Sequence, residues 1–274
     1  MEKKIKQLNK DGTMVQITTV DERWYLKPLP DVEGVPQIVT YPSVTWITEH
    51  YPKGVGFYKW LAEKGWDEAE AIKEAAGDRG SKVHQAIEIL INGGEVRMDG
   101  KLLNKTTGEE EEIKLEEYEA IMSYVAWHKL VNPKILAVEG VVFNDEYHYA
   151  GTIDLICEIN GEKWIVDFKT SQAVYPSHEM QVSAYKHCRD EWKDYKLGIL
   201  QIGYRRNKDK YKFTEVDDKF DLFLAAKQIW ANECKNVTYF QKDYPTVLTL
   251  ASPKPIAGNG KVTKKNVERN HATV

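Results

Sequence analysis

The chain has 274 residues, of which 42% are hydrophobic and 29% charged, and its formal net charge is −4 at pH 7. This composition is typical of a globular protein with a sizeable core, and no apolar run approaches the roughly 18 residues that span a membrane. Three scattered cysteines argue against a disulfide framework or a zinc site, and they are too few for an iron–sulfur cluster.

The first half of the chain predicts strands followed by helices. The segment 1–12 is polar, so we expect it to be mobile. It also lacks the apolar stretch of a secretion signal, so we expect the protein to be cytoplasmic. Residues 13–27 alternate as one or two strands do, and the prolines and glycine of 28–36 indicate a loop. The next predicted elements are a helix from Ser43, two or three helices over 55–92 with breaks at Gly65 and Gly77, a polar excursion over 95–112, and a long helix over about 113–130.

From residue 135 the pattern changes to strands. The predicted elements are, in order, strands over 135–143, 147–159 and 163–169, a helix over 177–192, strands over 196–205 and 210–216, and a helix over 218–235. This order predicts a mixed α/β (α+β) fold, in which helices flank a central mixed β-sheet and the N-terminal part adds a helical elaboration. The expected divisions are N-terminal strands and a loop over 1–42, a core over 43–245, and a flexible basic tail over 246–274.

The most informative segment is the hairpin whose turn is Asn160-Gly161, a dipeptide typical of tight turns. Because side chains alternate along a strand, Asp167 and Lys169 point to one face, and equal counting from the turn places Asp154 opposite Asp167. Two carboxylates in this position repel each other unless a cation lies between them. Oxygen ligands suit Mg²⁺ or Mn²⁺. The alternative is a salt bridge from Lys169 to one of the acids on a surface hairpin.

Neighbouring residues favour the metal interpretation. Gly151 lies three positions before Asp154, where a side chain would crowd a ligand or a backbone that approaches the strand. Gln181 and Tyr185 share one face of the next predicted helix and can hold a phosphate or a water. A divalent cation would neutralise a phosphodiester and make water more acidic, and Lys169 would stabilise the charged phosphate.

Five features occur in one order along the chain. They are Arg79-Gly80-Ser81-Lys82-Val83-His84, Glu139, Gly151-Thr152-Ile153-Asp154, Asp167-Phe168-Lys169-Thr170-Ser171 and Gln181-Val182-Ser183-Ala184-Tyr185. This combination resembles the motifs of the PD-(D/E)XK nuclease superfamily, and within it the RecB-like exonucleases. The resemblance covers about residues 79–190 and implies a restriction-endonuclease-like core.

The resemblance also implies roles for single residues. The ligands of one or two Mg²⁺ or Mn²⁺ ions would be His84, Asp154, Asp167 and the main-chain carbonyl of Phe168. Lys169 would be catalytic together with the two aspartates, and Glu139, Gln181 and Tyr185 would complete the site. Taken alone, His84 would be interpreted as a histidine packed against the core.

Two departures from the family pattern refine the expectation. The chain lacks the cysteines of the iron–sulfur members, so it resembles the phage-type members that have no cluster. It also lacks the GxxxxGK[ST] motif of a helicase motor. Any motor would therefore belong to a partner.

We therefore expect a metal-dependent DNA exonuclease that acts on the ends of linear DNA in repair, recombination or phage DNA processing. A recombination, annealing or helicase protein is a candidate partner, and no membrane is expected. The alternatives are a structure- or sequence-specific endonuclease of the same fold and a non-catalytic DNA-binding or assembly module. Candidate phosphate-binding side chains are those of Lys53, Lys59, Lys82, Arg205, Arg206, Lys208 and Lys210.

Overall fold

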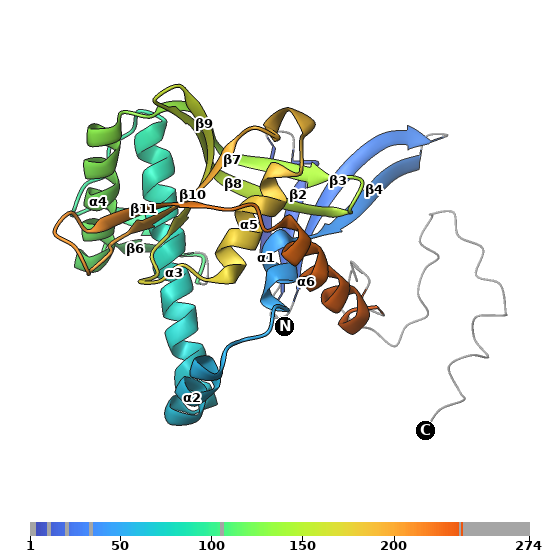
Figure 1. The fold of residues 1–274 in the computed structure, drawn as a ribbon, viewed down its shortest axis with the longest axis horizontal. Coiled ribbons are helices and arrows are strands. Elements are labelled where there is room, and N and C mark those ends of the chain that lie inside the picture. Colours follow the sequence, from blue (N-terminus) through green and yellow to red (C-terminus); the bar gives the residue numbers. More distant parts are fainter. Residues whose placement is uncertain are drawn as a thin grey trace, which may run out of the picture. The chain divides into compact units, whose positions relative to one another are not determined.

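The structure is a computed structural model that describes residues 4–9, 12–19, 22–32, 35–104, 107–235 and 237. Within these ranges the chain forms α-helices and three β-sheets (Figure 1). The predicted class is confirmed, because helices flank a central sheet that contains both parallel and antiparallel strand pairs. The predicted tail, 246–274, lies outside the described residues. None of the helices in the described part is both long and apolar enough to cross a membrane.

The central sheet has the strand order β11-β10-β9-β8-β7. Its strands are β7 (Lys134–Asn144), β8 (Tyr149–Ile159), β9 (Glu162–Lys169), β10 (Lys196–Ile202) and β11 (Tyr211–Val216). Strands β9 and β10 are parallel, and the chain between them contains α5 (Pro176–Lys186) and the short 3₁₀ helix Asp190–Trp192. The single helix predicted over 177–192 is therefore too long, since the α-helix ends at Lys186.

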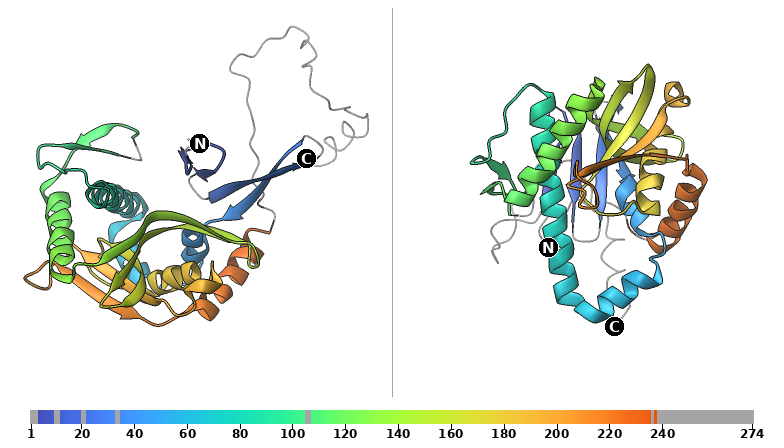
Figure 2. Two further views of the ribbon diagram at one scale, coloured as in Figure 1. Left: turned by 90° about the horizontal axis from the view of Figure 1, so that it is seen from above. Right: turned by 60° about the vertical axis from the view of Figure 1, so that its left-hand side comes forward.

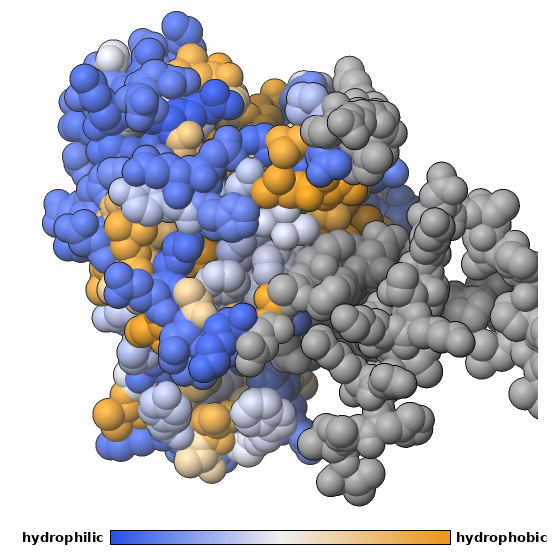
Figure 3. Space-filling model, turned by 90° about the vertical axis from the view of Figure 1, so that its right-hand side faces the viewer, coloured by the Kyte–Doolittle hydropathy of each residue, from blue (hydrophilic) through white to orange (hydrophobic). Residues whose placement is uncertain are grey.

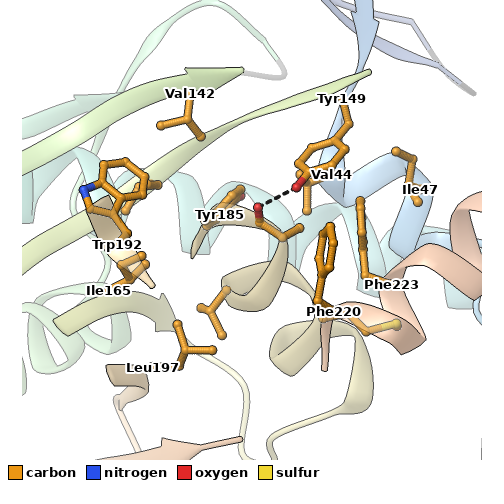
Figure 4. Packing of buried hydrophobic residues seen from close by; sticks show 14 of the residues in the cluster. Val44, Ile47, Val142, Tyr149, Ile165, Tyr185, Trp192, Leu197, Phe220 and Phe223 are labelled. Carbon is orange, nitrogen blue, oxygen red and sulfur yellow. Dashed lines mark hydrogen bonds between the residues drawn. The ribbon is translucent and has the colours of Figure 1, made fainter. Parts of the chain in front are cut away.

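Both faces of the central sheet are covered by helices, and this explains why the middle of β9, from Trp164 to Val166, is apolar without alternation. One face, which includes Ile165, packs against α1 (Val44–Glu49), α5 and α6 (Phe220–Glu233). In this layer the hydroxyl of Tyr149 donates a hydrogen bond to the carbonyl of Ala184 at 2.9 Å (Figure 4). The other face, which includes Val166 and Phe168, packs against α3 and α4 (Figure 2).

Helices α2 (Val55–Lys64), α3 (Trp66–Ile91) and α4 (Leu115–Val131) form the predicted helical part. Gly65, with φ +76°, separates α2 from α3 as predicted. The predicted break at Gly77 is wrong, because α3 continues through it: one interior glycine costs about 1 kcal/mol, which a helix of 26 residues tolerates. The excursion over 95–112 contains a small hairpin of β5 (Lys101–Leu103) and β6 (Glu110–Glu112).

The N-terminal residues form a separate antiparallel sheet, in the order β1 (Lys4–Gln7), β2 (Val15–Thr18), β3 (Arg23–Val32) and β4 (Val35–Pro42). The expectation of a mobile start is wrong for Lys4–Gln7, since β1 pairs with β2, whereas residues 1–3, 10 and 11 lie outside the described residues. The loop predicted over 28–36 is also wrong, since most of it continues β3 and β4. Described pairs of β3 with β2 end at Leu26, so its prolines beyond that point have a strand partner on one side only, where a missing N–H is tolerated.

The surface in Figure 3 carries mostly hydrophilic residues on its described part, with hydrophobic residues in small groups between them.

The N-terminal sheet joins the central sheet at β8. There the Tyr25 hydroxyl lies 3.1 Å from Thr152 Oγ1, and Ser43 bridges to Ala150. Two sheets that are remote in sequence therefore contact each other at the first residues of β8.

Candidate active site

A cleft of about 310 Å³ opens where α3, α5, strands β7 to β9 and the N-terminal sheet meet. We name it the carboxylate cleft. Most of the side chains that the sequence nominated line it, namely those of His84, Glu139, Asp154, Lys169, Gln181 and Tyr185. Asp167 lies behind this lining, 1% exposed, and contacts it through Lys169. The structure therefore brings together residues that are up to about a hundred positions apart in the chain.

The two aspartates come from the β8–β9 hairpin. Its register runs from Ile159 opposite Glu162 to Leu155 opposite Val166, as counted from the turn. This register brings Asp154 next to β9, where its Oδ2 accepts a hydrogen bond of 2.7 Å from the main-chain N–H of Phe168. The hairpin thus brings the Asp154 carboxylate to the end of β9, close to Asp167.

Lys169 is held in place by a chain of side-chain contacts. Its Nζ lies 2.8 Å from Asp167 Oδ2 and donates a hydrogen bond of 2.9 Å to Gln181 Oε1. The Gln181 amide donates in turn to the Tyr185 hydroxyl at 2.9 Å. Gln181 and Tyr185 are one turn apart on α5, so the predicted helix face is confirmed as part of the cleft.

Gly151 has a role beyond the one expected. A Cβ atom at this position would lie 2.4 Å from Cε1 of the Tyr185 ring, far inside van der Waals contact. The glycine therefore leaves room for the Tyr185 ring, and it also lines the cleft. Without it, the aromatic ring that ends the chain of contacts from Lys169 would have to move.

His84 and Glu139 approach Asp154 from two other elements. His84 Nδ1, on α3, lies 3.3 Å from Asp154 Oδ1, and its Nε2 lies 3.1 Å from the carbonyl oxygen of Phe168. Glu139, on β7, has φ +49°, a left-handed backbone conformation that costs about 1–3 kcal/mol for a residue other than glycine. His84, Glu139 and Asp154 each offer one possible ligand atom, and these three atoms lie within 4.8 Å of one another.

Burial and neighbouring charges shift the pKa values of Asp167, Asp154 and His84. Burial raises the pKa of Asp167 to about 6, because the repulsion from Asp154 adds to it and the attraction of Lys169 does not cancel it. For Asp154 burial also acts upward, but His84 and Lys169 outweigh it and lower the pKa. Burial acts downward on His84, and the Asp154 carboxylate raises its pKa overall.

The donors of the carboxylate cleft suit a divalent cation that prefers oxygen ligands. They combine carboxylates, one imidazole and a main-chain carbonyl within a small volume. Apart from the ion pair with Lys169, neither oxygen of the buried Asp167 carboxylate has a hydrogen-bond partner among the described residues. Lys169 already pairs this buried carboxylate at Oδ2, so only its Oδ1 is an unfilled acceptor that a cation would complete.

The N-terminal sheet forms a wall of the cleft that the sequence did not predict. Lys6, Gln16, Arg23 and Tyr25 line it. Gln16 donates to the Tyr25 hydroxyl at 2.7 Å, and Lys6 Nζ lies 3.6 Å from Glu139 Oε2. No local signal in the sequence indicates this contact, because it joins strands more than a hundred residues apart.

Lys82 does not fit the role suggested for it. Its side chain is 1% exposed, and its Nζ lies 2.7 Å from Glu111 Oε2 and 3.2 Å from Glu117 Oε1. A buried, paired ammonium is not available to a phosphate. The prediction that Lys82 contacts a nucleic-acid backbone is therefore wrong.

Comparison with models of known protein families and with curated proteins finds no match for this chain. The motifs of the sequence and the geometry of the cleft therefore indicate what the protein does.

Proposed function

We propose that this protein is a metal-dependent nuclease of the PD-(D/E)XK type, and specifically a DNA exonuclease that hydrolyses phosphodiester bonds. The observation that supports it best is the convergence of His84, Glu139, Asp154, Asp167 and Lys169 at one cleft, although they come from four different elements. Repair, recombination or phage DNA processing, together with a recombination, annealing or helicase partner, is the biological setting that we propose.

In this proposal the residues that would hold Mg²⁺ or Mn²⁺ are His84, Asp154, Asp167 and the Phe168 carbonyl, with Glu139 as a further carboxylate. Such a cation supplies charge neutralisation at the phosphodiester and increases the acidity of water.

The chain's own residues orient the substrate. Lys169 places an ammonium beside the carboxylates, where it stabilises negative charge that develops on the phosphate. Gln181 fixes the Nζ of Lys169, and Tyr185 fixes Gln181. A lysine held on two sides in this way loses little entropy when the substrate arrives, which favours catalysis by preorganisation.

The first test is digestion of end-labelled linear DNA by the purified protein. We expect cleavage with Mg²⁺ or Mn²⁺, none with EDTA, and none by Lys169→Ala. The exposed lysine on the same strand, Lys163, provides the matched control: Lys163→Ala should cleave like the wild type. Undiminished cleavage by Lys169→Ala would remove that residue from the mechanism.

The exonuclease proposal is separated from an endonuclease by a closed circular substrate. An exonuclease needs an end, so the circle should persist while the same DNA, linearised, is degraded. Cleavage of the circle would favour the endonuclease. Binding of both forms without turnover in either metal would favour a non-catalytic DNA-binding module.

A further inference from the structure

Two arginines and a lysine line a second cleft beside the first. This basic cleft, of about 130 Å³, is defined by Arg79, Arg205, Lys210, Glu116 and Glu119. Thr170, the residue after Lys169, lines both clefts. A DNA strand whose cleaved phosphate lies at Lys169 would therefore meet the basic cleft with its neighbouring phosphates.

We propose that the basic cleft binds the phosphates next to the cleaved one, with Arg79 and Arg205 as the main contacts. The inference rests on the proposed nuclease function and adds to it a second binding site with named residues. Arg79 lies one residue before Gly80, which lines the carboxylate cleft from α3. Arg205 comes from the turn between β10 and β11.

The charges of the basic cleft are arranged for a ligand with more acceptor oxygens than the protein supplies. Arg79 Nη1 and Arg205 Nη2 both lie 3.3 Å from one atom, Oε2 of Glu116, and Lys210 Nζ lies 2.9 Å from Glu119 Oε1. Three cations face two carboxylates. Arginine binds a phosphate best through two parallel hydrogen bonds, which a single shared oxygen does not offer.

Glu116 is able to give way to a phosphate. Its side chain is 47% exposed and lies in the first turn of α4, so water can solvate it when it leaves the arginines. Exposed ion pairs of this kind contribute about 0–1 kcal/mol, and a nucleic acid can replace them. In the free protein Glu116 keeps the two guanidinium groups together at the position where a phosphate would bind.

The basic cleft is fixed relative to Lys169. The main-chain N–H of Arg205 donates to Gln172 Oε1 at 2.8 Å, and the Gln172 amide donates to the Gly203 carbonyl at 3.0 Å. The Gln201 amide donates to the Ser171 carbonyl at 2.9 Å. The residues after the catalytic lysine are thus tied to the turn that carries Arg205. Charges that only keep a surface soluble need no such anchoring.

The test compares the variant Arg79→Gln/Arg205→Gln with Arg206→Gln, which removes a charge from the same turn but outside the cleft. Affinity for fluorescein-labelled single-stranded and duplex oligonucleotides is measured in EDTA between about 50 and 200 mM KCl. Each lost phosphate contact should reduce the slope of log K against log salt by about 0.7–0.9. An equal reduction per removed charge in the double variant and in Arg206→Gln would overturn the proposal. If the double variant does not fold, Arg205→Gln alone, which changes an exposed turn residue, gives the same comparison.

Glu116→Gln provides a test of opposite sign. It removes the competing carboxylate, so binding at low salt should become several-fold tighter. If the ion pairs were only structural, this variant would bind no better, and that result would overturn the inference.

Because binding is measured without hydrolysis, the two proposals fail separately. A reduced slope in a protein that never cleaves DNA refutes the nuclease and supports this site. Cleavage with an unchanged slope refutes this site and supports the nuclease.

Discussion

Two groups of buried charges lie two positions apart on α3, one around Lys82 and one around His84, and they are built differently. In the Lys82 group every carboxylate oxygen has a donor. Lys82 contacts Glu111 Oε2 and Glu117 Oε1, while the Asn104 amide and the Lys114 N–H donate to the other two oxygens. Burial alone would lower the pKa of Lys82, but its two acids outweigh this and raise the pKa.

The His84 group is paired less completely. Its carboxylates, those of Glu139, Asp154 and Asp167, face Lys6, His84 and Lys169, and among the residues that the structure describes no hydrogen bond reaches the Oδ1 of Asp167. A closed group of charges fastens α3 to its neighbours, whereas an open group is suited to a ligand that completes it. We infer that the first group serves stability and the second serves function, and this difference can be tested.

The largest effect is expected for Asp167→Asn. Nuclease activity should fall by about 10³-fold, roughly 4 kcal/mol, because the change removes a charged ligand of the proposed metal ion. The free energy of unfolding should not fall, since the neutral amide removes the repulsion from Asp154 and the burial of a charge. Initial rates on linear DNA and urea unfolding measure the two quantities. A large loss of stability would show that Asp167 is structural.

The reverse pattern is expected for Lys82→Met. It leaves Glu117 buried without its cation and should lower the free energy of unfolding by about 3 kcal/mol, the lower end for a broken buried pair, because Glu111 is partly exposed. The folded fraction should keep its specific activity. Methionine retains the apolar stem of lysine, which separates loss of charge from loss of packing. A folded but inactive Lys82→Met protein would contradict the division between the two groups.

Metal binding should stabilise the folded protein, and only through the residues of the His84 group. A cation at 100 times its Kd adds about 2.7 kcal/mol to the free energy of unfolding. Wild type and Lys82→Met should therefore both melt at a higher temperature when Mg²⁺ or Mn²⁺ is added. Asp154→Asn should show no such rise in the same titration. Equal rises in all three proteins would locate the cation elsewhere.

Much of this architecture could be predicted from the sequence. The β8–β9 register follows from the Asn160-Gly161 turn and the two-residue period of strands, so the approach of Asp154 to the end of β9 was predictable. Helix spacing also predicted that Gln181 and Tyr185 share one face of α5, although it did not predict that Gln181 accepts a hydrogen bond from Lys169. These features depend on interactions that are local in the chain or shared with a family pattern.

Other features depend on contacts that local patterns do not record. The N-terminal sheet lines the cleft through Tyr25 and Thr152, which lie 127 positions apart. The left-handed conformation of Glu139 belongs to a residue type that gives no sign of it. The sequence predicts Lys82 as a surface cation, but the structure buries it beside Glu111 and Glu117. In each case tertiary packing overrides local preference.

The smallest effect in this series is expected for Gly151→Ala. This variant tests whether the contacts from Tyr185 through Gln181 hold Lys169 in position. The new methyl group would meet the Tyr185 ring at 2.4 Å, so the ring must shift and the free energy of unfolding should fall by about 2 kcal/mol. The shift would also move Gln181 and loosen Lys169, so kcat should fall while DNA affinity in EDTA stays unchanged. Gly140→Ala is the matched control on the neighbouring strand, because a Cβ there meets nothing within 4 Å. If Gly140→Ala and Gly151→Ala had equal effects on kcat, the contacts from Tyr185 to Lys169 would not position the lysine.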